Sequence, residues 1–184
     1  MVSSRELGEA LGVTAAQVRR DLGYFGQFGS PGLGYPIDSL APQIRRILGI
    51  DKPWRVALVG IGKLGGALVH YRGFERQGFQ IAALFDRDPA IVGREFPVGR
   101  VEPIDRLAAV VREKGIRLAI ITVPGSEAQA VLNELVASGV EGVFNFAPTA
   151  LAVPAGVAYV SIDLAMQLEQ LTYMVSQAKG KEGS

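Results

Sequence analysis

Cysteine is absent from the 184 residues of the chain, and histidine and tryptophan occur once each. Without cysteine there is no disulfide framework, no thiol nucleophile and no zinc–thiolate site. The formal net charge is only +1, so no global field attracts the protein to nucleic acid or membranes, and any such binding must use a local patch. Neither a signal peptide nor an apolar run of membrane-spanning length is present. We therefore expect a cytoplasmic protein with no membrane partner.

A glycine motif lies in the middle of the chain. An apolar run of strand length at 56–59 leads directly into Gly-x-Gly-x-x-Gly, and good helix formers follow. In dinucleotide-binding folds the first glycine makes a tight turn, the second lets the backbone approach a pyrophosphate, and the third lets the helix pack close to the strand. The N-terminus of that helix attracts phosphate. The six motif residues, all candidate cofactor contacts, are Gly60, Ile61, Gly62, Lys63, Leu64 and Gly65.

An acidic residue follows the next predicted strand. The apolar run 79–85 ends in Asp86, which lies 21 positions after Gly65. In a dinucleotide fold this carboxylate accepts hydrogen bonds from the adenine ribose hydroxyls and repels a 2′-phosphate. The position therefore favours NAD(H) over NADP(H). Arg87 comes next in the chain and is able to pair with a phosphate, which leaves NADP(H) open as an alternative.

Residues 1–25 read as two short helices. Ser3 and Glu6 form a capping-box pattern before the first helix, and Thr14 caps the second. The second helix has an apolar face and a polar, basic remainder, which is typical of a helix-turn-helix. A helical hairpin with a solvated face explains the same pattern, and both interpretations stay open. The glycine-rich segment 26–36 suits either a linker or the β-hairpin of a winged helix, and a third helix is predicted over 38–50.

From 55 to 161 strands and helices alternate, which predicts a mainly parallel, doubly wound α/β sheet with helices on both faces. Ligands bind beyond the carboxyl ends of the strands in such sheets. The glycine motif and Asp86 should therefore share one edge with the ends of two later strands. Those strand ends are Thr122, Val123 and Pro124, and Asn145, Phe146, Ala147 and Pro148.

The tail is predicted to be one helix over 163–178, with Asp163 as its N-cap. Its apolar residues surround the helix, so one sheet face would not cover them all. A partner subunit is the natural cover, and docking on the chain's own domain is the alternative.

No catalytic constellation accompanies the dinucleotide motif. The only histidine, His70, falls on the first helix of the α/β region, and no Ser–His–acid set or metal-ligand cluster is visible. The residues after the last motif are too few for a substrate domain of ordinary size. A cofactor site without nearby chemistry favours a sensor that is not an enzyme. The alternative is a small NAD-dependent oxidoreductase or a cofactor-binding subunit.

Taken together, these segments resemble the Rex family of bacterial redox-sensing transcriptional repressors. The resemblance covers nearly the whole chain and is carried by residues 13–22, 24–26, 29–35, 60–65, 85–89, 122–124 and 145–148. It implies a homodimer with winged-helix domains on an NAD(H)-binding core and C-terminal helices swapped between subunits. It also implies repression at palindromic operator DNA while NADH is low and release of the DNA when NADH binds.

The resemblance implies three parts: a winged-helix domain over 1–52, a Rossmann domain over 53–161, and a dimerisation helix with tail over 162–184. By this comparison the chain begins at the second helix of the family's winged helix, and Pro31 stands where the wing usually has a basic residue. Tyr71 and Asp163 fall where the family couples the nicotinamide end to dimer geometry. The expected DNA-binding residues are Thr14, Gln17, Arg19, Arg20, Tyr24 and Ser30.

Overall fold

The structure is a computed structural model that describes residues 1–29 and 32–181, the last four of them by backbone alone. It divides into two compact units, Met1–Pro53 and Trp54–Ser184.

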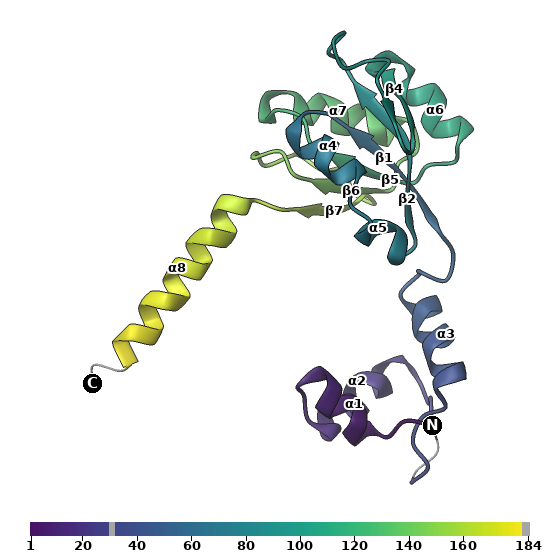
Figure 1. Cartoon of the computed structure of the whole chain (residues 1–184), viewed down its shortest axis with the longest axis vertical. Helices are drawn as coiled ribbons and strands as arrows, with labels where there is room; N and C mark the ends of the chain where they lie inside the picture. The colour runs from purple at the N-terminus through teal and green to yellow at the C-terminus, as the bar shows by residue number, and fades with distance from the viewer. Residues whose placement is uncertain (30–31, 182–184) are drawn as a thin grey trace. The chain divides into compact units, whose positions relative to one another are not determined.

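The first unit contains three helices, α1 (Ser4–Leu11), α2 (Ala15–Phe25) and α3 (Ile37–Ile47) (Figure 1). The predicted capping box is present. Ser3 Oγ accepts a hydrogen bond from the backbone N–H of Glu6 at 3.2 Å. In return, Glu6 Oε2 accepts one from the backbone N–H of Ser3 at 2.7 Å. Thr14 Oγ1 accepts from the N–H of Gln17 at 3.1 Å and starts α2 in the same way. Between α2 and α3, the described residues form one antiparallel bridge, in which Tyr35 pairs with Val2.

The second unit is built on a seven-stranded sheet in the order β3-β4-β2-β1-β5-β6-β7. All neighbouring pairs are parallel except β3 and β4. This is the predicted doubly wound arrangement, with the strand order reversing beside β1. The strands are β1 (Trp54–Val59), β2 (Phe79–Asp86), β3 (Glu95–Phe96), β4 (Gly99–Pro103), β5 (Leu118–Ile121), β6 (Gly142–Asn145) and β7 (Ala158–Ser161).

Two apolar cores lie on the two faces of the sheet. In β1, Ala57 and Val59 point to one core while Val56 and Leu58 point to the other, as the two-residue period of a strand requires. The first core is covered by α6 (Leu107–Glu113) and α7 (Gly125–Ala137), and the second is covered over part of the sheet by α4 (Lys63–Val69) and α5 (Gly73–Arg76). A 3₁₀ turn, η1 (Ile104–Arg106), precedes α6.

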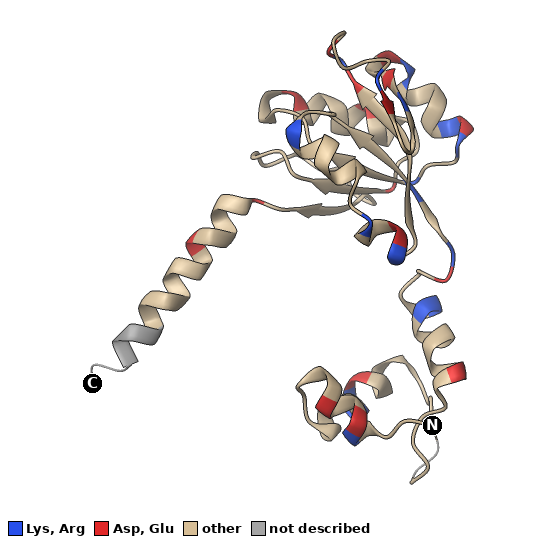
Figure 2. Ribbon diagram, in the orientation of Figure 1, with Lys and Arg blue, Asp and Glu red and all other residues tan. Residues whose placement is uncertain are grey.

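The C-terminal helix α8 (Leu164–Lys181) begins as predicted, because Asp163 Oδ1 accepts hydrogen bonds from the N–H groups of Ala165 at 2.9 Å and Met166 at 3.2 Å. Every side chain from 164 to 177 is exposed, including the large apolar ones, and Glu169 is the only charged residue in that span. Figure 2 shows how little charge the helix carries along its described length. The described part of this chain therefore leaves the apolar surface of α8 uncovered. No helix among the described residues is long and apolar enough to span a membrane.

Candidate functional site

The carboxyl ends of β2, β1 and β5 surround a cleft of about 560 Å³. Seven of the predicted cofactor residues line it: Gly60, Gly62, Asp86, Arg87, Thr122, Val123 and Pro124. The parallel strands bring together segments that lie far apart in the sequence, as the sheet-edge argument predicts.

The three motif glycines differ in what surrounds them. Gly60 has φ +94°, and a side chain there would lie 2.8 Å from Val123, so only glycine suits this turn. A Cβ on Gly65 would lie 1.9 Å from the carbonyl oxygen of Gly60, so α4 packs against the turn only because Gly65 has no side chain. Around Gly62, by contrast, nothing lies within 4 Å of a Cβ position. The space beside Gly62 is open to a ligand.

Thr122 fixes the glycine turn from the neighbouring strand. Its hydroxyl donates to the carbonyl oxygen of Gly60 at 2.6 Å and lies 3.1 Å from that of Val59, while its N–H donates to Val59 at 2.9 Å. These bonds order the turn before any ligand arrives.

Asp86 is 9% exposed and its carboxylate is already engaged. Oδ2 accepts from the N–H of Ile61 at 2.6 Å, and Oδ1 accepts from the N–H of Asp88 at 2.9 Å. The first bond joins the end of β2 to the glycine motif, a role the sequence argument missed. A carboxylate offers about four acceptor positions, so Asp86 can hold the loop and still accept from a ribose hydroxyl.

Arg87 is paired with an acidic residue that sequence reasoning also missed. Its guanidinium lies 2.6 Å from the carboxylate of Glu127, in the first turn of α7. The two side chains meet across the cleft from elements far apart in the sequence, so no local pattern predicts the pair. The cleft is completed by apolar side chains that were not anticipated either, among them Ile91, Ile104 and Val131.

Asn145 is fully buried at the end of β6, and its side chain holds the turn that follows. Oδ1 accepts from the N–H of Ala147 at 3.0 Å. Four oxygens lie within 3.4 Å of Nδ2: Ala147 O, Thr149 O, Tyr159 Oη and Ser161 Oγ. The network binds the 145–148 turn to β7, which leads into α8.

The remaining predicted cofactor residues do not line this cleft. Ile61, Lys63, Leu64 and Gly65 belong to the glycine loop and α4, and Phe146, Ala147 and Pro148 follow β6 further along the same sheet edge. Tyr71 lies between α4 and α5 and is exposed, with its ring 5.1 Å from that of Phe74, and Asp163 caps α8. Within one described chain these two residues are not brought together in the cleft.

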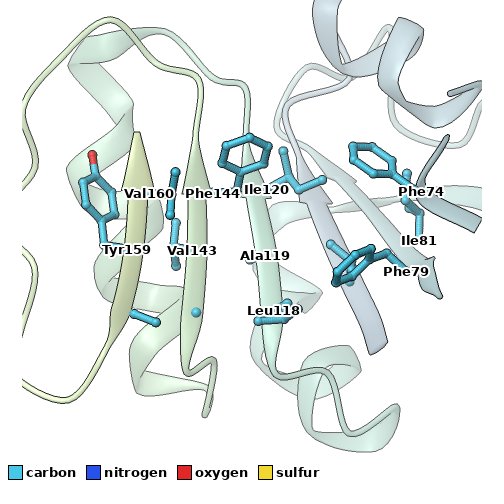
Figure 3. A pocket seen from close by; sticks show the side chains of 13 residues that line it. Phe74, Phe79, Ile81, Leu118, Ala119, Ile120, Val143, Phe144, Tyr159 and Val160 are labelled. Carbon is cyan, nitrogen blue, oxygen red and sulfur yellow. The ribbon is translucent and has the colours of Figure 1, made fainter. Parts of the chain in front are cut away.

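A second hollow, about 340 Å³, lies on the sheet face that α4 and α5 leave bare. Figure 3 shows its walls, formed by side chains of neighbouring strands and of α5. Almost all of the lining is apolar, including Phe74, Phe79, Phe144 and Val160, and Val160 is 59% exposed. We call this surface the apolar groove. Its almost complete lack of polar lining groups distinguishes it from the cleft at the ends of β2, β1 and β5.

On α2, the predicted DNA-binding residues divide between two sides of the helix. Gln17, Arg20 and Tyr24 have helical spacing for one face, and Tyr24 is 83% exposed. Arg19 faces α1 instead, where its guanidinium donates to Ser4 Oγ at 2.9 Å. Thr14 caps the helix. Ser30, with its neighbour Pro31, lies outside the described residues.

Comparison with known proteins identifies the family. A Roseiflexus sp. (strain RS-1) protein named redox-sensing transcriptional repressor Rex is 47% identical over 176 residues, covering 96% of this chain and 80% of that relative. The Rex protein of Carboxydothermus hydrogenoformans is 46% identical, covering 95% of this chain and 84% of the relative. The chain belongs to the Rex family of redox-sensing transcriptional repressors. Its relatives are named as repressors rather than enzymes, which supports the sensor interpretation over the oxidoreductase.

Solved structures and family models agree with Rex membership. The crystal structure of RSP in complex with β-NAD⁺ and operator DNA matches with a TM-score of 0.90 and 33% identity over 99% of this chain and 84% of that one. RSP in complex with β-NADH matches with a TM-score of 0.83 and 31% identity over 99% of this chain and 85% of that one. Residues 51–149 match the CoA binding domain model, and residues 1–23 match a model for the N-terminus of DNA-binding proteins.

Proposed function

We propose that this Rex protein binds NAD(H) in the cleft at the ends of β2, β1 and β5. The observation that carries the proposal is the contrast among the motif glycines, since Gly60 and Gly65 are required by the fold whereas the space at Gly62 is left for a ligand. The loop and the start of α4 would receive the pyrophosphate, and Asp86 the adenine ribose. Thr122–Pro124 and Asn145–Pro148 continue along the edge toward the nicotinamide half.

Titration with NADH tests this assignment. Asp86→Ala should weaken NADH binding and reduce the preference over NADPH, because it removes both the ribose acceptor and the bond to Ile61. Asp86→Asn removes the charge but keeps one acceptor oxygen, so it retains a backbone bond to either Ile61 or Asp88 and loses the other. If the parent chain bound NADPH as tightly as NADH, Asp86 would not have this role.

For DNA, we propose that the N-terminal unit binds palindromic operator DNA with α2 as the recognition helix. Arg20 and Tyr24 are exposed and Gln17, on the same face, is partly exposed, which supports base or phosphate contacts. We propose that Thr14 and Ser30 add contacts on either side. Arg19 would orient α2 through Ser4. RSP, which was crystallised with operator DNA, provides the precedent.

Charge substitutions on α2 test this surface. Arg20→Ala should weaken binding, with a smaller salt dependence if the contact is to phosphate, or with relaxed specificity at one position if it is to a base. Arg112→Ala, which removes a cation from the other unit, is the matched control. Equal DNA affinity for the parent and Arg20→Ala would exclude a DNA contact by Arg20, and the same result for Tyr24→Ala as well would contradict α2 as the recognition helix.

A homodimer follows from two uncovered apolar surfaces in one chain. We propose that α8 of each subunit swaps onto the apolar groove of its partner, because both surfaces are large, apolar and almost without charge. The N–H of Ile162 donates to the carbonyl oxygen of Asn145 at 2.9 Å, so the start of α8 is tied to the cofactor edge. Tyr71 and Asp163 would couple that edge to dimer geometry.

The oligomeric state of variants tests the swap. Leu171, which is 53% exposed, should lie in the interface, so Leu171→Glu should give a monomer or an aggregate, as should deletion of residues 163–184. Gln170→Glu adds the same charge one residue earlier on a polar position and should leave the dimer intact. A well-behaved dimer after the deletion would place the interface elsewhere.

The full proposal is a cytoplasmic repressor that holds operator DNA while NADH is low. NADH would favour a dimer geometry in which the two recognition helices no longer match half-sites spaced by whole turns of the duplex, each about 10 base pairs. Such a change requires different NADH affinities for the two geometries. DNA and NADH must then weaken each other's binding reciprocally.

A further inference from the structure

The Arg87–Glu127 pair places two opposite charges at the side of the cleft where Asp86 lies. The side chain of Arg87 is 68% exposed, whereas that of Glu127 is 19% exposed, and 2.6 Å separates Nη2 of the first from Oε1 of the second. Both residues line the cleft with Asp86. The contact joins the loop after β2 to the first turn of α7, the two elements that lie on either side of this part of the cleft.

The pair changes what Arg87 can do. A guanidinium beside a ribose site is the usual partner for a ribose phosphate, through paired N–H donors. Here Nη2 contacts the carboxylate of Glu127, which holds the guanidinium toward α7 and offsets part of its charge. A phosphate added to the ribose would therefore meet two carboxylates, Asp86 and Glu127, and would compete with Glu127 for the guanidinium of Arg87.

We propose that Glu127 is a specificity-determining residue, which acts by holding Arg87 so that the cleft rejects adenosine ribose that carries a phosphate. The rejected ligands would include NADPH, with its 2′-phosphate, and coenzyme A, with its 3′-phosphate. The second case matters because residues 51–149 match a CoA binding domain model. This inference rests on the proposed binding of NAD(H).

Direct binding measurements on the full chain test the role of Glu127. NADH and NADPH are titrated into the parent, Glu127→Gln, Arg87→Ala and the double variant at fixed salt, with nicotinamide fluorescence as the readout. Glu127→Gln releases Arg87, so NADPH affinity should rise about tenfold, the gain of one charged hydrogen bond. NADH affinity should change by less than about twofold, because the ribose hydroxyls still meet Asp86. Coenzyme A, measured by displacement of NADH, should gain affinity in the same variant.

The double variant shows whether Glu127 acts through Arg87. With Arg87→Ala in place, Glu127→Gln should no longer raise NADPH affinity appreciably. The matched control is Glu141→Gln, which releases Arg117 from a similar pair at 2.7 Å on the surface and should leave both affinities unchanged.

Two results would overturn the inference. One is an unchanged ratio of NADPH to NADH affinity in Glu127→Gln while NADH still binds. The other is an equal gain with and without Arg87, which would mean that Glu127 does not act through Arg87. Failure of the parent to bind NADH would refute the proposed function as well, so the two failures are distinguishable.

Discussion

Gly65→Ala adds one methyl group at the tightest point of the glycine turn. The new Cβ would lie 1.9 Å from the carbonyl oxygen of Gly60 and 2.9 Å from Thr122 Oγ1. The first distance is about 1.5 Å shorter than an ordinary van der Waals contact, and the obstacle is backbone, so α4 must move. Overpacking of this kind costs about 1–3 kcal/mol. The unfolded chain loses about 0.4–1 kcal/mol of conformational freedom on Gly→Ala, which offsets only part of that cost.

Gly66→Ala is the matched control, one residue later in the same helix. Nothing lies within 4 Å of its Cβ position, so only the unfolded-state term remains and the variant should be more stable than the parent. Urea unfolding followed by fluorescence of Trp54, the only tryptophan, reports the second unit. NADH affinity should fall in Gly65→Ala and not in Gly66→Ala. A midpoint for Gly65→Ala at or above that of the parent would refute the packing argument.

Three further variants probe the site and the first helix. Thr122→Val removes the hydroxyl bonds to the glycine turn and should cost about 1 kcal/mol in urea unfolding. Asn145→Ala leaves the N–H of Ala147 without its buried acceptor and should cost about 1–3 kcal/mol. The hydrogen bonds from Ser3 lower the pKa of the Glu6 carboxyl group, because they favour its ionised form. The stabilisation of α1 by ionised Glu6 should therefore be present above about pH 4.5, the ordinary pKa, and be lost as the pH falls through the lowered pKa. In Ser3→Ala, NMR titration should show the pKa of Glu6 raised toward its ordinary value.

Local signals in the sequence predicted much of this fold. The starts of three helices could be predicted, because the side chains of Ser3, Thr14 and Asp163 accept hydrogen bonds from backbone N–H groups only two or three residues away. The glycine turn could be predicted, because the lack of space for side chains at its glycines arises within one strand–turn–helix unit. The segment 87–116 was not resolved into elements, because β3 and β4 are short and depend on their pairing with each other and with β2.

The site residues missed by sequence reasoning share one cause, which is contact between distant segments. Glu127 meets Arg87 only once β2 and α7 are placed on either side of the cleft. The second role of Asp86 depends on the position of Ile61 across the sheet edge. The contact of Arg19 with Ser4 also joins two helices, and it agrees with the helical spacing that separates Arg19 from the face carrying Arg20. The role of Arg19 in DNA binding stays a prediction.

The most direct test of the central claim is a paired affinity measurement on the full chain. Binding to palindromic DNA whose half-sites are spaced by whole turns, each about 10 base pairs, is measured with and without NADH at fixed salt. NADH binding is measured with and without the same DNA. The account predicts that each ligand weakens the other by the same factor. DNA affinity that is unchanged at saturating NADH would contradict it.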